Sequence, residues 1–193
     1  MSTEGYHVTI VAGPNGSGKT TFAKKYLQLA KQPFLNADEI AKEISPDHAD
    51  KVQLSAGKEY FRRLHSLIED KKSFTFESTL SGQGSTKIIE RLRSAGFTIR
   101  ITYLFLETPD VCIARVAERV SNGGHHVPSE DVIRRYWRSK RNFWSKYKNL
   151  VDDWSIFTNT NDNFEDVAFG DETGHEVSNS IKFLCFIEGV DHD

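Results

Sequence analysis

The chain has 193 residues, of which 38% are hydrophobic and 27% charged, and its formal net charge is −2. This length suits one domain that buries its own core, and the near-neutral charge gives no general indication of a nucleic-acid partner. No apolar run approaches the ~18 residues of a membrane span, and the polar start Met1–Gly5 does not predict a signal peptide. Cys112 and Cys185 form neither a disulfide framework nor a metal-like spacing, so we expect a cytoplasmic protein.

The first elements predict a phosphate-binding loop. Val8–Ala12 is typical of a buried strand, Gly13–Thr20 matches the pattern G-x-x-x-x-G-K-[ST], and Thr21–Lys31 is typical of a helix. Main-chain amides of such a loop point at a phosphate group, and the helix dipole also favours an anion there. We therefore expect ATP and Mg²⁺ as cofactors, with the Lys19 ammonium at the β- and γ-phosphates and the Thr20 hydroxyl at the metal. The cofactor-binding residues are predicted to be Gly13, Pro14, Asn15, Gly16, Ser17, Gly18, Lys19, Thr20 and Thr21.

Strand-like and helix-like stretches alternate along the rest of the chain. Strands are expected at 33–36, 73–76, 97–106 (the central one) and 154–158 (the last core strand), and helices at 37–44, 49–71, 86–94, 109–120 and 129–149. This alternation predicts an α/β P-loop kinase fold, in which a parallel central sheet is flanked by helices and ligands bind beyond the carboxyl ends of the strands.

The domain organisation follows from the same order of elements. Residues 1–160 are expected to form the P-loop kinase core, including a helical lid around 115–140. Residues 161–193 are expected to form a C-terminal extension packed on this core, as a hairpin or a strand–helix pair.

Carboxylates follow two of the predicted strands. Asp38 comes shortly after the second strand, where it could deprotonate an accepting hydroxyl. The alternative is that Asn36 or Asp38 caps a helix. Glu77, with Ser78 and Thr79, directly follows the third strand, and its carboxylate is predicted to contact the metal or the substrate.

A glycine-rich break separates two arginine-bearing helices. Arg115 and Arg119 precede Gly123-Gly124, and Arg134-Arg135 follow it, as a closing lid with cations on its moving part would require. The alternative is a solvated basic helix. Arg134 and Arg135 cannot both face one site, because neighbouring residues on a helix diverge by ~100°. His125 and His126 lack a third metal ligand at a suitable spacing.

Aromatic residues interleave with the basic ones in the second of these helices. Stacking on single-stranded nucleic acid would explain this pattern. Core packing of Ile133, Trp137 and Trp144 at helical spacing explains it at least as well. We therefore treat nucleic acid as the less favoured partner. The aromatic residues are Tyr136, Trp137, Phe143, Trp144 and Tyr147.

Taken together, these motifs resemble the zeta toxin family of P-loop kinases, especially its shorter bacterial members. The resemblance covers roughly residues 7–160. The matching pieces occur in the family's order and are Gly13–Thr20, Asn36–Ile40, Phe76–Leu80, Arg115–Arg119 and Gly123–Pro128 followed by Ile133–Arg135. The resemblance implies phosphorylation of a hydroxyl, in the best-understood members the 3′-hydroxyl of a UDP-N-acetyl amino sugar. It also implies that a small protein antitoxin is a possible partner, which no feature of this sequence itself supports.

Residue roles carry over where the motifs match. Lys19 and Thr20 correspond to the phosphate and Mg²⁺ positions, Asp38 to the catalytic base, and Arg119 to the first lid arginine. Glu77 and Thr79 correspond to substrate-side polar contacts, and Glu77 is also a candidate metal contact beside Thr20. In larger members the second lid arginine precedes the proline-led helix, where this chain has His125 and His126, so Arg134 or Arg135 is the expected replacement.

The sequence therefore predicts an ATP-dependent kinase that phosphorylates a hydroxyl of a small molecule, such as a UDP-N-acetyl amino sugar. The adenine is expected near Asn159 or Asn161. Two other functions stay open: a kinase of a polynucleotide end or another metabolite, and an ATP-bound regulatory switch. The base predicted at Asp38 argues against the switch, which needs no acceptor-activating group.

Overall fold

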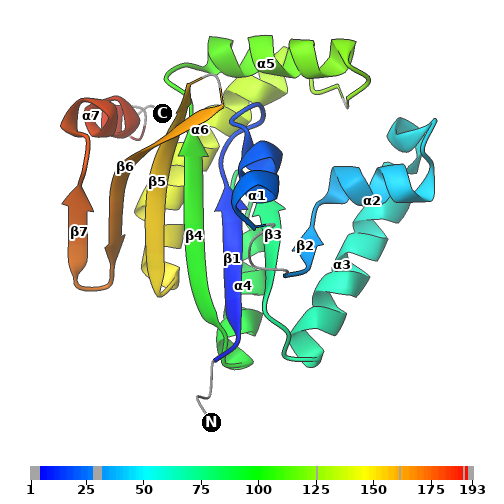
Figure 1. Cartoon of the computed structure of the whole chain (residues 1–193), viewed down its shortest axis with the longest axis horizontal. Coiled ribbons are helices and arrows are strands. Elements are labelled where there is room, and N and C mark those ends of the chain that lie inside the picture. The colour runs from blue at the N-terminus through cyan, green and yellow to red at the C-terminus, as the bar shows by residue number, and fades with distance from the viewer. Residues whose placement is uncertain (1–4, 28–31, 125, 161, 189, 191–193) are drawn as a thin grey trace.

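The structure is a computed structural model that describes residues 5–27, 32–124, 126–160, 162–188 and 190. Within these residues, seven strands form one sheet in the order β2-β3-β1-β4-β5-β6-β7 (Figure 1). The strands are β1 (His7–Ala12), β2 (Phe34–Leu35), β3 (Phe74–Ser78), β4 (Thr98–Phe105), β5 (Asp153–Thr160), β6 (Asn163–Asp171) and β7 (Gly174–Val177).

The predicted parallel sheet is confirmed for the first five strands, and β4 is the central strand as expected. The prediction that residues 154–158 form the last core strand is wrong. The predicted C-terminal hairpin, β6 and β7, pairs antiparallel with β5 and so extends the same sheet. An antiparallel edge on a parallel sheet is common, because a hairpin needs no crossover helix.

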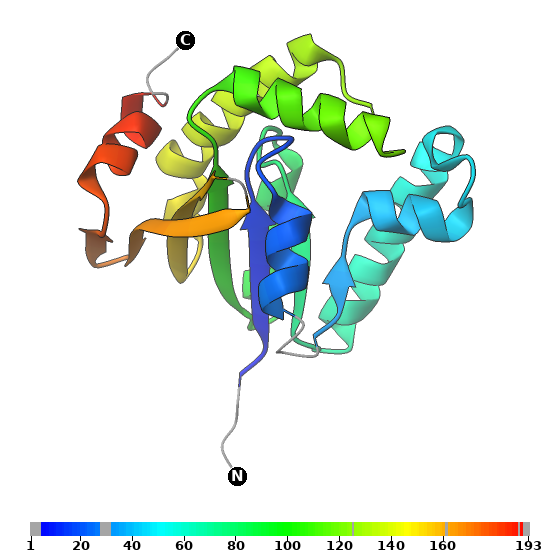
Figure 2. The same ribbon diagram turned by 45° about the horizontal axis from the view of Figure 1, so that its top comes forward.

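The helices follow the predicted order. They are α1 (Lys19–Leu27), α2 (Ala37–Ile44), α3 (Gln53–Glu69), α4 (Gly84–Ser94), α5 (Pro109–Ser121), α6 (Ser129–Ser145) and α7 (Ser180–Glu188), with 3₁₀ turns at Ala49–Val52 and Tyr147–Leu150. Helix α1 lies on one face of the sheet and α4 and α6 on the other, while α5 crosses above the carboxyl end of β1 (Figures 1 and 2). The predicted end of the first helix, at Lys31, lies outside the described residues.

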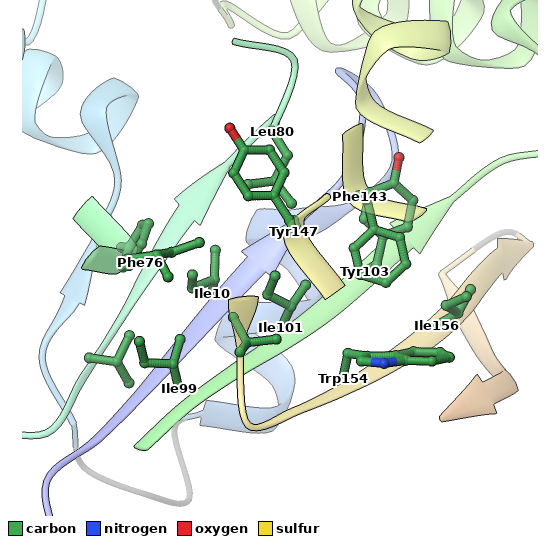
Figure 3. Close-up of a cluster of buried hydrophobic side chains, with 14 of the residues drawn as sticks. Ile10, Phe76, Leu80, Ile99, Ile101, Tyr103, Phe143, Tyr147, Trp154 and Ile156 are labelled. Carbon is green, nitrogen blue, oxygen red and sulfur yellow. The ribbon is translucent and has the colours of Figure 1, made fainter. Parts of the chain in front are cut away.

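The main core lies on the face of the sheet that carries α4 and α6 (Figure 3). Alternate residues of β4 point into it, because successive side chains of a strand face opposite sides; these are Ile99, Ile101, Tyr103 and Phe105. Phe186 of α7 packs on the same cluster, with its ring centroid 5.4 Å from that of Phe105. Burying a side chain of this kind stabilises the fold by about 1.5–3 kcal/mol. The C-terminal helix therefore shares the core of the sheet.

Helix α6 packs two of its three predicted core residues, because Trp137 and Trp144 are partly buried against the apolar clusters. Its buried residues include Val132, Tyr136 and Phe143, whereas Ile133 is exposed. Lys140, from the basic stretch, is also buried, with its ammonium over four aromatic rings and donating to the Cys185 carbonyl. Burial lowers the pKa of Lys140 to about 8. The interleaved aromatic and basic residues are therefore largely core contacts, which favours packing over nucleic-acid stacking as the reason for the pattern.

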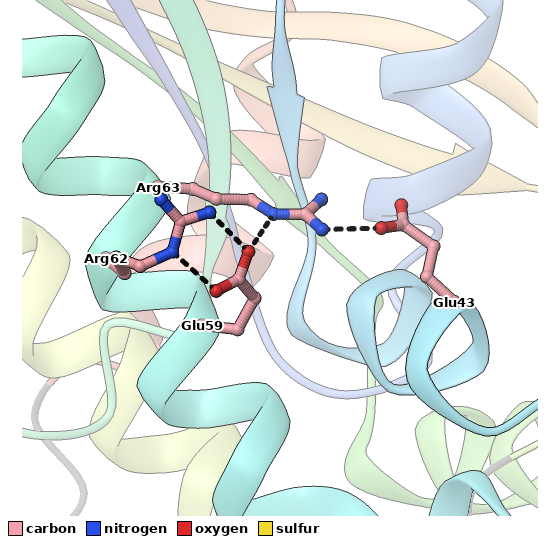
Figure 4. Close-up of polar contacts among 4 residues, drawn as sticks. All are labelled: Glu43, Glu59, Arg62 and Arg63. Carbon is pink, nitrogen blue, oxygen red and sulfur yellow. Dashed lines mark hydrogen bonds and ion pairs between the residues drawn. The ribbon is translucent and has the colours of Figure 1, made fainter.

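A network of ion pairs joins α2 to α3 (Figure 4). Glu59 accepts hydrogen bonds from both Arg62 and Arg63, which lower the pKa of its carboxyl to about 2. Arg63 also reaches Glu43 of α2 at 2.7 Å. Exposed pairs of this kind contribute little to stability.

No helix in the described part of the chain combines the length and apolar character needed to span a membrane.

Candidate active site

Residues Gly13–Gly18 form the loop between β1 and α1, as predicted for a phosphate-binding loop. The Lys19 ammonium donates to the carbonyl oxygens of Gly13, at 2.9 Å, and Pro14, at 2.8 Å. Burial lowers the pKa of Lys19, and the nearby carboxylate of Glu77 opposes this shift. The loop therefore holds its lysine at the floor of the site, supported by its own backbone.

A cleft of about 680 Å³ opens above this loop. Residues of helix α5 line one wall, and the first turn of α2 with the carboxyl end of β3 lines the other. The cleft brings together most of the predicted site residues, which come from separate parts of the chain. Its lining residues are Asn15, Gly16, Gly18, Lys19, Thr20, Thr21, Asn36, Ala37, Asp38, Glu77, Ser78, Thr79, Arg115, Glu118, Arg119, Asn122 and Asp162.

Polar oxygens gather at the floor of the cleft. Asn36 donates from Nδ2 to Thr20 Oγ1 at 3.3 Å. Burial raises the pKa of Glu77, while the charge of Lys19 and hydrogen bonding from Thr20 and Asn36 oppose the rise. Glu77 Oε1 is buried and has no hydrogen-bond partner in the described part of the chain. Because an unsatisfied buried carboxylate oxygen is costly, its presence points to a cation or a donor group that binds here.

Asn36, and not Asp38, caps α2. The Asn36 side chain accepts hydrogen bonds from the backbone N–H groups of Asp38 and Glu39, so the predicted cap is confirmed at Asn36, while the base role of Asp38 stays a prediction. The Asp38 carboxylate lies in the first turn and faces α5 across the cleft. Its Oδ2 is 4.0 Å from Nη1 of Arg119, and the two side chains are 46% and 39% exposed.

Arg119 is positioned by the glycine-rich break that follows its helix. The N–H of Gly124 donates to the Arg119 carbonyl at 2.8 Å. A Cβ atom at Gly124 would lie 2.5 Å from Cγ of Arg119, so only glycine allows this close packing. The two glycines therefore fold the chain back against the arginine at the end of α5.

The other two predicted lid arginines are not brought to the cleft. Arg134 and Arg135 form ion pairs with Asp131 of their own helix, at 2.8 Å and 3.5 Å, and neither lines the cleft. His125 lies outside the described residues, and His126 is exposed. No group of three potential metal-binding His, Cys, Asp or Glu side chains occurs among the residues that the structure describes.

Helices α5 and α6 pack on each other through a small apolar cluster of their own. Cys112 and Val116 of α5 meet Val132 and Tyr136 of α6 there, and Val127 joins them between the helices. The cluster also contains Leu106, directly after β4, and the Tyr136 hydroxyl donates to the Leu106 carbonyl at 2.7 Å, so the helix pair is tied to the end of the central strand.

The loop after β3 is held in a strained conformation at the edge of the cleft. Leu80 is buried and has φ +52°, a left-handed value that costs a non-glycine residue about 1–3 kcal/mol. Asn142 donates to the Leu80 carbonyl at 2.8 Å, and the Tyr147 hydroxyl donates to Gly82 at 2.6 Å. These contacts fix the segment that carries Ser78 and Thr79.

Sequence reasoning gave no site role to several cleft residues. Glu118 of α5 and Asn122, the residue that caps its C-terminus, line the cleft together with Arg115 and Arg119. Their spacing of three and four residues was the available signal, because such residues share one face of a helix. Asp162 also lines the cleft, whereas Asn161, a predicted adenine neighbour, lies outside the described residues.

Comparisons with known proteins agree with this architecture. The model of the AAA domain family AAA_33 matches residues 8–140. An uncharacterized protein of Haemophilus influenzae is 34% identical over 127 residues, which are 64% of this chain and 88% of the relative.

Two solved structures share the fold. A chain of the AvrRxo1-ORF1:ORF2 complex with ATP has a TM-score of 0.76 at 14% identity, covering 98% of this chain and 66% of that one. A chain of the PezAT toxin–antitoxin system of Streptococcus pneumoniae has a TM-score of 0.66 at 14% identity, covering 98% and 86%. The present chain thus spans only 63–66% of the length of the AvrRxo1 chains.

Proposed function

The chain belongs to the AAA domain family, and on that premise we propose that it is an ATP-dependent kinase that phosphorylates a hydroxyl of a small molecule. The observation that carries the proposal is the arrangement of Asp38 and Arg119, which face each other across a cleft whose floor is the phosphate-binding loop. A carboxylate and an arginine above a triphosphate site are the two groups that phosphoryl transfer to an alcohol needs.

The loop would bind the phosphates of ATP through its main-chain amides. Lys19 would exchange its two loop carbonyls for oxygens of the β- and γ-phosphates. The buried ammonium keeps hydrogen-bond acceptors in both states, and the neutral carbonyls give way to charged phosphate oxygens, which bind it more strongly.

The cleft also fits Mg²⁺. Thr20 Oγ1 and the Glu77 carboxylate would supply hard oxygen ligands, and Glu77 Oε1 has no hydrogen-bond partner among the described residues. Mg²⁺ is usually bound by one or two carboxylates together with phosphates and water, so a larger protein cluster is not required. When bound, the ion would neutralise charge on the phosphates.

In the proposed reaction the acceptor oxygen forms a bond to the γ-phosphorus, and the bond from that phosphorus to the β–γ bridging oxygen breaks. Asp38 takes the proton of the hydroxyl, and ADP leaves. Arg119, which pairs with Asp38 in this structure, would turn to the γ-phosphoryl oxygens as negative charge spreads over them. A single movement of Arg119 would then both free the Asp38 carboxylate and stabilise the charge on the phosphoryl group.

For the acceptor we propose a sugar nucleotide, such as a UDP-N-acetyl amino sugar, with Glu77 and Thr79 on its side of the cleft. The support is the resemblance of the Asn36–Ile40, Phe76–Leu80 and Gly123–Pro128 segments to zeta toxins, and the shared fold with a PezAT chain. The same likeness supports a small protein antitoxin as a partner.

Incubation with γ-labelled ATP and a cell extract tests the function. We expect the label to appear in a small molecule, whose mass identifies the acceptor. Label in oligonucleotide ends would instead indicate a polynucleotide kinase, and label released only as inorganic phosphate would indicate a slow ATP-hydrolysing switch. Either result would contradict the proposal.

A substitution at Glu77 tests the magnesium site. Glu77→Gln keeps the size of the side chain but replaces its anionic oxygen, so we expect the Mg²⁺ concentration for half-maximal activity to rise about 10–100-fold. A titration of activity with Mg²⁺ at saturating ATP measures this. Glu90→Gln, on the distant helix α4, is the matched control. An unchanged Mg²⁺ requirement in Glu77→Gln would place the metal elsewhere.

A further inference from the structure

Asn159 joins three segments around the phosphate-binding loop. It is the penultimate residue of β5 and is 3% exposed. Its Nδ2 donates to the Ser17 carbonyl at 3.1 Å, and its Oδ1 accepts from the N–H of Asp162 at 2.9 Å. Its own carbonyl accepts from Arg115 at 3.4 Å. One buried side chain thus ties the loop to the β5–β6 turn, beside an arginine of the cleft.

The contact with Ser17 determines how one loop peptide is oriented. In a trans peptide the carbonyl and the following N–H point in opposite directions. With the Ser17 oxygen turned to Asn159, the N–H of Gly18 points away from Asn159. Gly18 lines the cleft, so this places a main-chain donor toward the phosphate side.

The loop and Asn159 are also in close packing. A Cβ atom at Gly18 would lie 2.2 Å from Nδ2 of Asn159, and Gly18 has φ +90°. Any side chain at Gly18 would therefore displace the side-chain amide of Asn159. Both polar atoms of the buried Asn159 side chain are engaged by the protein, and the residue does not line the cleft, which favours a role in holding the loop over contact with adenine.

We propose that Asn159 is a positioning residue that holds the Ser17–Gly18 peptide so that its N–H faces the phosphate chain of the nucleotide. This role depends on one part of the proposed function, namely that the phosphates of ATP bind at this loop. It acts on the phosphates and not on the base, which separates it from the predicted role of this residue beside adenine.

Binding of two ligands by the full chain tests the role. The probes are ATP and inorganic tripolyphosphate, which shares the phosphate chain but has no base, each measured by calorimetry at 15 °C. In Asn159→Ala we expect the Kd of both ligands to rise about tenfold or more, by similar factors. Thr160→Ala, an exposed neighbour at the end of the same strand, is the control and should match the unmodified chain.

Asn159→Asp supplies a second variant of nearly the same size. It keeps an oxygen for Asp162 but loses the donor to Ser17, so it should weaken both ligands at least as much. Circular dichroism and thermal melting establish that each variant is folded at the temperature used. A residue that only stabilised the fold would lower the Tm and leave both Kd values of the folded protein unchanged.

Three results would overturn the inference. Weaker ATP binding with unchanged tripolyphosphate binding would assign Asn159 to the base, and normal binding of both ligands by either variant would remove the positioning role. If the unmodified chain bound neither ligand, the assignment of the nucleotide site to this loop would be wrong, and so would the role of Asn159. Normal variants of a chain that binds both ligands would leave the kinase proposal intact.

Discussion

Replacing Lys19 by alanine is expected to abolish phosphoryl transfer. The ammonium is the main cation that the loop itself directs into the cleft, and it is already held there by the carbonyls of Gly13 and Pro14. Removing one preorganised donor to a developing charge costs about 10²–10³ in kcat, and lysine also contributes to binding of the triphosphate. We therefore expect both a kcat loss of at least this size and weaker ATP binding, measured by transfer of labelled phosphate and by calorimetry.

Lys24→Ala provides the matched control for this experiment. Lys24 lies on the same helix, but it is exposed and pairs with Glu39 at 2.6 Å, outside the cleft. Its loss should leave kcat and KM for ATP within about twofold, because exposed ion pairs contribute little. Comparable rates for Lys19→Ala and Lys24→Ala would show that the loop is not the donor site.

Replacing Asp38 by asparagine is expected to abolish transfer and to spare ATP binding. The change keeps the shape of the side chain and the cap of α2, because that cap is formed by Asn36. It removes the proton acceptor, and general-base catalysis contributes about 10²–10⁴-fold. ATP should bind at least as tightly, since a negative charge near its phosphates is lost. Single-turnover transfer and calorimetry measure the two quantities separately.

Glu39→Gln is the control for Asp38. Glu39 follows Asp38 in the first turn of α2, yet it pairs with Lys24 and does not line the cleft. Near-normal turnover of Asp38→Asn on the true acceptor would show that another group takes the proton. A loss of the same size in Glu39→Gln would indicate that the first turn of α2 matters only for structure.

The fold and the location of the site follow from local sequence signals. Each strand of the parallel part ends at the same edge, so the loop after β1, Asp38 after β2 and Glu77 at the end of β3 had to meet. The structure brings these residues and Thr79 into one cleft. Their catalytic, metal-binding and substrate-binding roles stay predictions.

Predictions that depended on long-range packing were weaker. A basic helix gives no local sign of which cation is buried, and Lys140 lies in the core because aromatic rings from β4, α6 and α7 surround it. Likewise, the pairing of Arg134 and Arg135 with Asp131 competes with any contact to the cleft. The helical spacing of Asp131 could be read from the sequence. Whether the two arginines pair with it or reach the cleft could not.

The contact of Asn159 with Ser17 is the clearest example of a feature that the sequence alone does not predict. The two residues are separated by 142 positions, and only the neighbouring placement of β5 and the loop brings them together. The residue was expected near adenine because it follows a strand. Its second side-chain hydrogen bond, from the N–H of Asp162, depends on the β5–β6 turn, which no local pattern specifies.

A crystal structure with a non-hydrolysable ATP analogue and Mg²⁺ tests the central claim most directly. The account predicts the triphosphate on Gly13–Thr20, the γ-phosphate between Asp38 and Arg119, and the Asp38 carboxylate within reach of an alcohol attacking that phosphorus. A γ-phosphate bound away from Asp38, with that carboxylate directed into bulk solvent even when α5 has closed, would contradict it.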